Sequence, residues 1–207
     1  EEHIHALAME ALVHALLGTE PKGSVPVAAA REAMEGSGLG PLSAEQVGHL
    51  YEYGRGFRPE ITKQKTVSLH NSAFGKRNQG LFYTPQTIVR HIVRASLDAL
   101  HLSKPVDSLH LKLLDPSVGT GTFLLYALED LTERTLKARD SSGVSFGAAL
   151  SDIRERIRET AVHYGVSCDP DEETAIRIHL MSSCLYGVDL DPVAVHIAKT
   201  ALKRSAF

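Results

Sequence analysis

LLDPSVGTGTF, at residues 113–123, is the most informative segment of this chain of 207 residues. The leucines at 109, 111, 113 and 114 predict a short apolar strand that ends at Asp115, and a helix is expected from about Thr122 to Leu136. Gly119 and Gly121 permit a sharp turn in which a ligand touches the backbone, and the helix behind them adds oriented amides. The segment therefore predicts a ligand-binding loop in which Asp115 takes a cationic or hydroxylated group.

This loop departs from the dinucleotide pattern GxGxxG, because Leu124 stands where the third glycine is expected. That glycine allows a helix to pack closely on a strand in dinucleotide-binding folds. A GxG after a strand is also found in plain tight turns, so the loop by itself leaves both interpretations open.

A second acidic motif is LYGVDLDP, at residues 185–192. It ends a predicted strand from Cys184 to Val188, where a carboxylate commonly accepts hydrogen bonds from both ribose hydroxyls. Asp189 fits that role and Leu190 is placed to border an adenine, whereas Asp191 is expected to cap the helix that begins with Pro192. The alternative for Asp189 is an ordinary loop acid.

The third motif is GLFYTP, at residues 80–85. Its two aromatics suit either a flat ligand or core packing. We expect Thr84 to cap the following helix and Pro85 to be its first residue. The buried stripe of that helix is predicted to comprise Ile88, Ile92, Val93 and Leu97.

The first 75 residues read as a helical segment, and residues 76–207 as an α/β domain with parallel strands. Ser43 to Gln46 forms a capping box before a helix that carries Tyr51 and closes at Gly54 and Gly56. Residues 61–69 are predicted to be a strand or a hairpin arm. Further helices are expected at residues 146–164, 171–181 and 193–202.

Charge and composition exclude some classes of protein. The formal net charge of −3 disfavours a simple nucleic-acid-coating protein. From Lys76 to Lys112, however, the sequence has six cationic and two anionic residues, which fits either a phosphate-facing patch or a solvated helix face. The two cysteines form no CxxC pair, so we expect no metal site, free thiols and a reducing, cytoplasmic setting. No apolar run is long enough to cross a membrane.

Together, GLFYTP, LLDPSVGTGTFLL and LYGVDLDP resemble, in order, the motifs of adenine-N6 DNA methyltransferases of restriction–modification systems. The resemblance is to type I modification subunits and fused type II enzymes, and it covers roughly residues 76–207. LYEYGRGFRPE, at residues 50–60, is loosely similar to the leader of such enzymes.

The resemblance implies a partial Rossmann-like domain that binds S-adenosylmethionine, in a parent enzyme that acts on double-stranded DNA. The cofactor-binding residues that it implies are Phe82, Tyr83, Thr84, Pro85, Asp115, Pro116, Ser117, Gly119, Thr120, Gly121, Phe123, Asp189 and Leu190. Catalysis in this family also needs a Pro-Pro-aromatic segment that holds the flipped adenine. The chain has no Pro-Pro pair, so we expect it to end before that segment and to be inactive alone, with no catalytic residue of its own. Exposed strand edges then favour self-association.

Two other interpretations remain open from the sequence. One is another nucleotide- or S-adenosylmethionine-binding α/β protein, such as an RNA or protein methyltransferase. The other is a non-catalytic interaction module with a degenerate nucleotide fold.

Overall fold

The computed structural model describes residues 11, 13, 28, 30, 32, 42–54, 56–61, 67–71, 84–102, 105–138 and 143–206. The chain divides into two compact units. The first unit comprises Glu1–Thr84, Gly119–Gly121 and Asp191–Ala201, and the second comprises Pro85–Val118, Thr122–Leu190 and Leu202–Phe207. The boundary that the sequence suggests near residue 75 stays a prediction.

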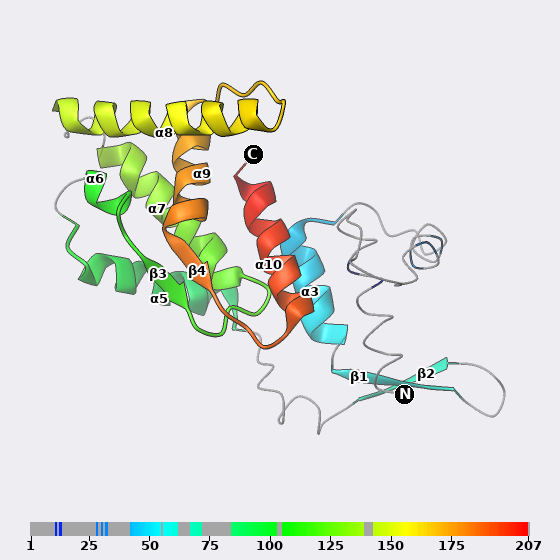
Figure 1. Ribbon diagram of the computed structural model, residues 1–207. Coiled ribbons are helices and arrows are strands. Elements are labelled where there is room, and N and C mark those ends of the chain that lie inside the picture. Colours follow the sequence, from blue (N-terminus) through cyan, green and yellow to red (C-terminus); the bar gives the residue numbers. More distant parts are fainter. Residues whose placement is uncertain are drawn as a thin grey trace. The chain divides into compact units, whose positions relative to one another are not determined.

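The described part of the first unit includes a well-capped helix and a hairpin (Figure 1). Helix α3 spans Ala44–Gly54. The amide of Ser43 donates to Oε1 of Gln46 (2.8 Å), and the amide of Gln46 donates to Oγ of Ser43 (3.1 Å), which confirms the capping box. Strands β1 (Phe57–Ile61) and β2 (Val67–Asn71) pair antiparallel. The strand or hairpin arm expected over residues 61–69 is confirmed at residues 67–69 of β2, whereas Ile61 ends β1 and residues 62–66 lie outside the described residues.

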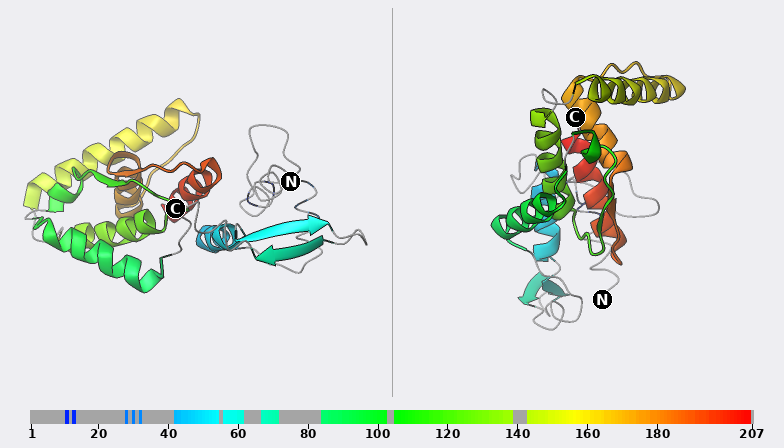
Figure 2. Two further views of the ribbon diagram at one scale, coloured as in Figure 1. Left: turned by 90° about the horizontal axis from the view of Figure 1, so that it is seen from below. Right: turned by 90° about the vertical axis from the view of Figure 1, so that its left-hand side faces the viewer.

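The second unit is mainly helical, and its helices lie close to where the sequence predicts them. In Figures 1 and 2, the long helix α8 crosses the ends of α6 and α9. The elements are α5 (Gln86–Ala99), α6 (Pro105–Ser108), β3 (Leu113–Asp115), α7 (Thr122–Ala138), α8 (Gly143–His163), α9 (Glu172–Ser183) and β4 (Leu185–Gly187). Helix α10 (Pro192–Ser205) begins in the first unit and ends in the second.

Strands β3 and β4 form a small parallel sheet, with Leu114 opposite Tyr186. The face of the sheet that these two side chains share is partly exposed to solvent, since Leu114 is 60% exposed and Tyr186 is 45% exposed. A sheet of parallel strands is ordinarily covered on both faces. The structure thus shows a mixed helical fold with a two-stranded parallel sheet, and the larger Rossmann-like sheet stays a prediction. Strand β3 is also shorter than predicted, because Leu109 is buried in a turn that follows α6.

Helix α5 differs from its sequence-based description at two points. Pro85 is the N-cap rather than the first helical residue, and no side chain of the described residues caps the helix, so the capping role predicted for Thr84 is wrong. The buried stripe runs through Val89, Val93 and Leu97 at intervals of four residues, while Ile88 and Ile92 are exposed. A step of one residue turns the helix by about 100°, which carries these isoleucines off the buried face.

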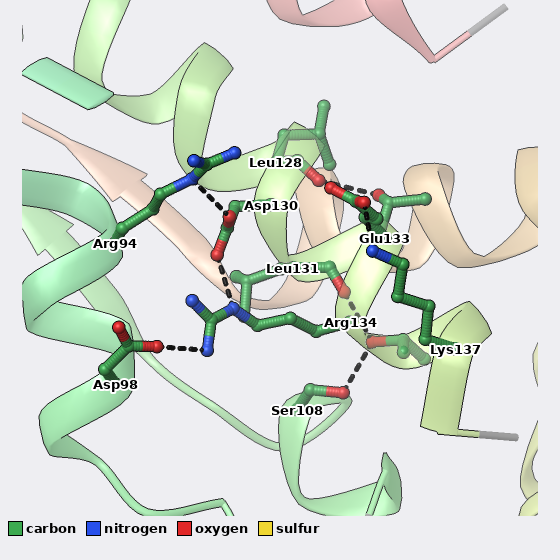
Figure 3. A network of polar contacts seen from close by, with 11 residues as sticks. Arg94, Asp98, Ser108, Leu128, Asp130, Leu131, Glu133, Arg134 and Lys137 are labelled. Carbon is green, nitrogen blue, oxygen red and sulfur yellow. Dashed lines mark hydrogen bonds and ion pairs between the residues drawn. The ribbon is translucent and has the colours of Figure 1, made fainter. Parts of the chain in front are cut away.

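Ion pairs join α5 to α7 (Figure 3). Asp130 of α7 pairs with Arg94 of α5 and with Arg134 one turn further along α7. Nη1 of Arg134 also lies 2.7 Å from Oδ1 of Asp98 on α5. Because Asp130 is largely buried between two guanidinium groups, its charge is compensated where solvent cannot screen it well.

This network bears on the phosphate-facing patch suggested by the sequence. Lys76, Arg77 and Lys104 lie outside the described residues. The other three cations have intramolecular partners: Arg90 lies over the ring of Tyr126, Arg94 pairs with Asp130, and Lys112 donates to the carbonyl oxygen of Ser183 and to the hydroxyl of Tyr186. The contacts of the described cations therefore indicate a structural role for them and not phosphate binding.

Both cysteines are free thiols, as expected. Cys184 is fully buried, with its Sγ 3.4 Å from the carbonyl oxygen of Leu109, and burial raises the pKa of its thiol. Within the described part of the chain, no helix combines the length and apolar character needed to cross a membrane.

Candidate functional site

The carboxyl ends of β3 and β4 are joined by two backbone hydrogen bonds beyond the strands themselves. The amide of Val188 donates to the carbonyl oxygen of Asp115, and the amide of Val118 donates to the carbonyl oxygen of Val188, both over 3.0 Å. Parallel strands bring their carboxyl ends to one edge, which is where open α/β sheets bind ligands. Asp115 and Asp189 thus follow adjacent strands at the same edge of the sheet.

Asp115 has one oxygen satisfied and one oxygen without a partner. Its Oδ1 accepts from the amide of Ser117 (3.0 Å). Its Oδ2 is buried and finds no hydrogen-bond partner among the residues that the structure describes. An ionised oxygen in this state is costly, so it is a natural acceptor for a ligand donor.

The charge of Asp189 adds to this cost. The pKa of Asp115 is raised mainly by burial, against a lowering by the Ser117 hydrogen bond, and the nearby negative charge of Asp189 raises it further. A carboxylate whose ionisation is disfavoured by burial and by a nearby negative charge is stabilised by a cation placed near it. The second unit thus presents a carboxylate pair suited to a positively charged ligand.

Leu124 is accommodated by a glycine on the neighbouring strand. A Cβ at Gly187 would lie 2.7 Å from Cγ2 of Val118 and 3.1 Å from Cδ1 of Leu124. The close approach of helix and strand that a third glycine permits in dinucleotide folds is therefore obtained here with the glycine on β4 and the leucine on α7. Sequence reasoning identified the missing glycine but not its replacement, since the two residues are 63 positions apart.

The bend at residues 119–121 lies in the first unit. Gly119 and Gly121 have positive φ angles of 51° and 94°, which confirms that the turn needs glycine. A Cβ at Gly121 would lie 2.9 Å from Cβ of Ala198 on α10, so that side of the bend is closed. A Cβ at Gly119 would meet one described atom within 4 Å, which is Oε1 of Glu52 at 3.6 Å.

Helix α3 packs directly on this bend. Thr120 is only 5% exposed, and its hydroxyl donates to Oε1 of Glu52 over 2.8 Å. A Cβ at Gly48 would lie 2.9 Å from Oγ1 of Thr120, so a glycine in α3 is what lets the two backbones approach. Oε2 of Glu52 is buried and has no hydrogen-bond partner within the described ranges.

Asp191 has the capping role predicted for it. Its Oδ1 accepts from the amide of Val193 over 3.0 Å, and its Oδ2 accepts from the hydroxyl of Tyr51 over 2.7 Å. Tyr51 and Glu52 therefore connect α3 to both the cap of α10 and the glycine bend. Sequence analysis did not assign a role to either residue or to Gly48. The signals were the loose leader match at residues 50–60 and the capping box.

The remaining predicted site residues are placed as follows. Leu190 is fully exposed at 102%, and Asp189, Thr84 and Phe123 are half-buried. Pro85, Pro116 and Ser117 are exposed, while Phe82 and Tyr83 lie outside the described residues. The glycine bend and Asp189 belong to different units, and their action on a common ligand stays a prediction.

The chain is similar to known DNA-modifying proteins. The chain matches the N-6 DNA methylase family over residues 67–206. It is also 30% identical over 113 residues to a protein of Methanocaldococcus jannaschii that is named as a type II restriction enzyme and methyltransferase. That alignment covers 55% of this chain and 7% of the archaeal protein.

Proposed function

Because the chain belongs to the N-6 DNA methylase family, we propose that it is the S-adenosylmethionine-binding portion of a site-specific DNA adenine-N6 methyltransferase. One observation carries this proposal: beside the charge of Asp189, Oδ2 of Asp115 is buried and has no hydrogen-bond partner among the described residues. A sulfonium cofactor brings positive charge to such a pair, whereas a phosphate-bearing dinucleotide would bring negative charge.

The proposed cofactor contacts follow the order of the motifs. Asp189 accepts hydrogen bonds from the two ribose hydroxyls, and the fully exposed side chain of Leu190 borders the adenine. Residues 82–85 together with 115–121 surround the methionine end, and Phe123 lies near them at the start of α7. Gly119 has no side chain, and among the described atoms a Cβ there would meet only Oε1 of Glu52 within 4 Å, so we place its backbone beside the ligand.

The activity of the whole protein is part of the same proposal. Its partner is double-stranded DNA, from which an adenine is flipped and methylated on N6. In-line transfer from a sulfonium requires the acceptor nitrogen to be aligned with the methyl carbon and the sulfur. Since the 207 residues contain no Pro-Pro-aromatic segment, we propose that this chain binds the cofactor without transferring its methyl group.

Isothermal titration calorimetry of the 207-residue chain with S-adenosylmethionine tests the proposal. We expect saturable binding at one site, which Asp189→Ala weakens about tenfold to a hundredfold, because a carboxylate that accepts from both ribose hydroxyls is lost. Glu129→Gln is the charge-matched control, since Glu129 is exposed on α7 and is part of none of the three motifs.

The absence of heat and of saturation from a sample with native circular dichroism would contradict the proposal. So would equal affinities for the wild-type chain and Asp189→Ala. In contrast, a chain that binds cofactor but leaves duplex DNA unmethylated agrees with it.

A further inference from the structure

We propose that Glu52 of helix α3 is a further cofactor-binding residue, which accepts a hydrogen bond from the α-ammonium group of S-adenosylmethionine. This inference rests on the proposed function and extends it to the segment that precedes the three motifs. It depends on contacts within the first unit alone: Glu52, Thr120 and the bend at Gly119.

The carboxylate of Glu52 is held in place by one of its two oxygens. Oε1 accepts from the buried hydroxyl of Thr120 over 2.8 Å, and this hydrogen bond fixes the orientation of the carboxylate plane. Oε2 is left buried and, within the part of the chain that the structure describes, without a hydrogen-bond partner. A buried carboxylate oxygen without a partner is destabilising, so it favours a bound donor.

Among the described residues, the surroundings of Gly119 are loosely packed on the side of this carboxylate. The position of a Cβ at Gly119 lies 3.6 Å from Oε1 of Glu52 and more than 4 Å from every other described heavy atom outside its chain neighbours. By comparison, a Cβ at Gly121 would collide with α10, and a Cβ at Gly48 would collide with Thr120. Among the described atoms, two of the three glycines are thus closely packed, and the one next to Glu52 has room for a Cβ.

The sign of the charge selects the ligand group. The methionine end of the cofactor carries an ammonium and a carboxylate, and a carboxylate beside Glu52 would be repelled. An ammonium has three donors and no acceptor, which matches a carboxylate oxygen that lacks a donor. The hydrogen bond is then charge-assisted and about twice as strong as a neutral one.

The test compares two neutral thioethers in calorimetry with the 207-residue chain. S-adenosylhomocysteine retains the amino-acid end of the cofactor, whereas 5′-methylthioadenosine lacks it and keeps the adenosine. We expect Glu52→Gln to weaken binding of S-adenosylhomocysteine about tenfold or more and to leave binding of 5′-methylthioadenosine unchanged.

Further variants control for folding and for charge. The amide of Glu52→Gln retains an oxygen for Thr120, and Glu52→Asp keeps the charge but withdraws it by one methylene. Glu52→Asp should weaken S-adenosylhomocysteine binding to an intermediate degree. Glu129→Gln removes an exposed carboxylate elsewhere and should bind both ligands as the wild type does. Circular dichroism of each variant establishes that it is folded.

The outcomes separate this inference from the proposed function. If the wild-type chain binds neither thioether, both are overturned. If it binds S-adenosylhomocysteine and Glu52→Gln binds it equally well, only the role of Glu52 is overturned. Equal losses for the two thioethers would also overturn it, because they would show that Glu52 acts on the fold and not on the amino-acid end.

Discussion

The two glycines of the bend should differ sharply in their tolerance of alanine. At Gly121, where φ is 94°, a new Cβ would lie 2.9 Å from Cβ and 3.0 Å from Cα of Ala198. The left-handed conformation costs roughly 1–2 kcal/mol for a residue with a side chain. The overlap with a packed helix adds roughly 1–3 kcal/mol. Gly121→Ala should therefore lower the free energy of unfolding by about 2–5 kcal/mol.

Gly119→Ala is the matched comparison, because Gly119 lies two residues before Gly121 in the same turn. Its φ is 51°, and its Cβ would make only an ordinary contact of 3.6 Å with Glu52. The conformational term of about 1–2 kcal/mol is then the whole expected loss. Urea unfolding of the two variants, followed by far-ultraviolet circular dichroism, measures the difference.

A double-mutant cycle isolates the steric part of the effect. Ala198→Gly alone should cost about 1 kcal/mol through helix propensity. Combined with Gly121→Ala, it removes the contact at 2.9 Å but leaves the one at 3.0 Å, so the double variant should be about 1 kcal/mol more stable than the sum of the two losses. Equal losses at Gly119 and Gly121, or a strictly additive cycle, would refute this account of the bend.

Two further predictions concern titratable side chains. A raised pKa means that the favourable contribution of Asp115 is present below its unfolded pKa and is lost as pH rises. Asp115→Asn should thus raise the free energy of unfolding of the unliganded chain at neutral pH, and with it the melting temperature, by at most about 1 kcal/mol in free energy for a half-exposed group. The variant should lose this advantage in acid, and a less stable variant at neutral pH would contradict the prediction. The second prediction concerns the cysteines: a thiol reagent should modify Cys168 in the folded chain and Cys184 only after unfolding. Burial removes Cys184 from solvent and raises the pKa of its thiol, and both effects slow its reaction. Modification of Cys184 at the rate of Cys168 in native buffer would show that this core opens.

Local chemistry accounts for what could be predicted from the sequence. The capping box at Ser43 and Gln46, the cap at Asp191 and the strand–glycine–helix order around Asp115 depend on residues a few positions apart. Their geometry follows from backbone hydrogen bonding, which is similar in every fold. For the same reason the extents of α7 and α9 could be predicted closely from apolar spacing.

The face of α5 was predicted less well. Its apolar residues allow two neighbouring stripes, one through Ile88 and Ile92 and one through Val89 and Val93. Spacing alone does not choose between stripes about 100° apart. The choice depends on what the partner helix presents, and here the ion pairs Arg94–Asp130 and Arg134–Asp98 join α5 to α7.

From its order of residues alone, this chain specifies the glycine bend, the acids that end two parallel strands and the family to which they belong. Packing between distant segments decided the rest: Gly187 lies beside Leu124, and Gly48 lies against Thr120. Glu52 accepts a hydrogen bond with one carboxylate oxygen, and its other oxygen is buried without a partner among the described residues. Such contacts join residues that are dozens of positions apart, and the residues next to a side chain in the sequence do not indicate which distant residue it will contact. The fold supplies those neighbours, and with them the chemistry of the site.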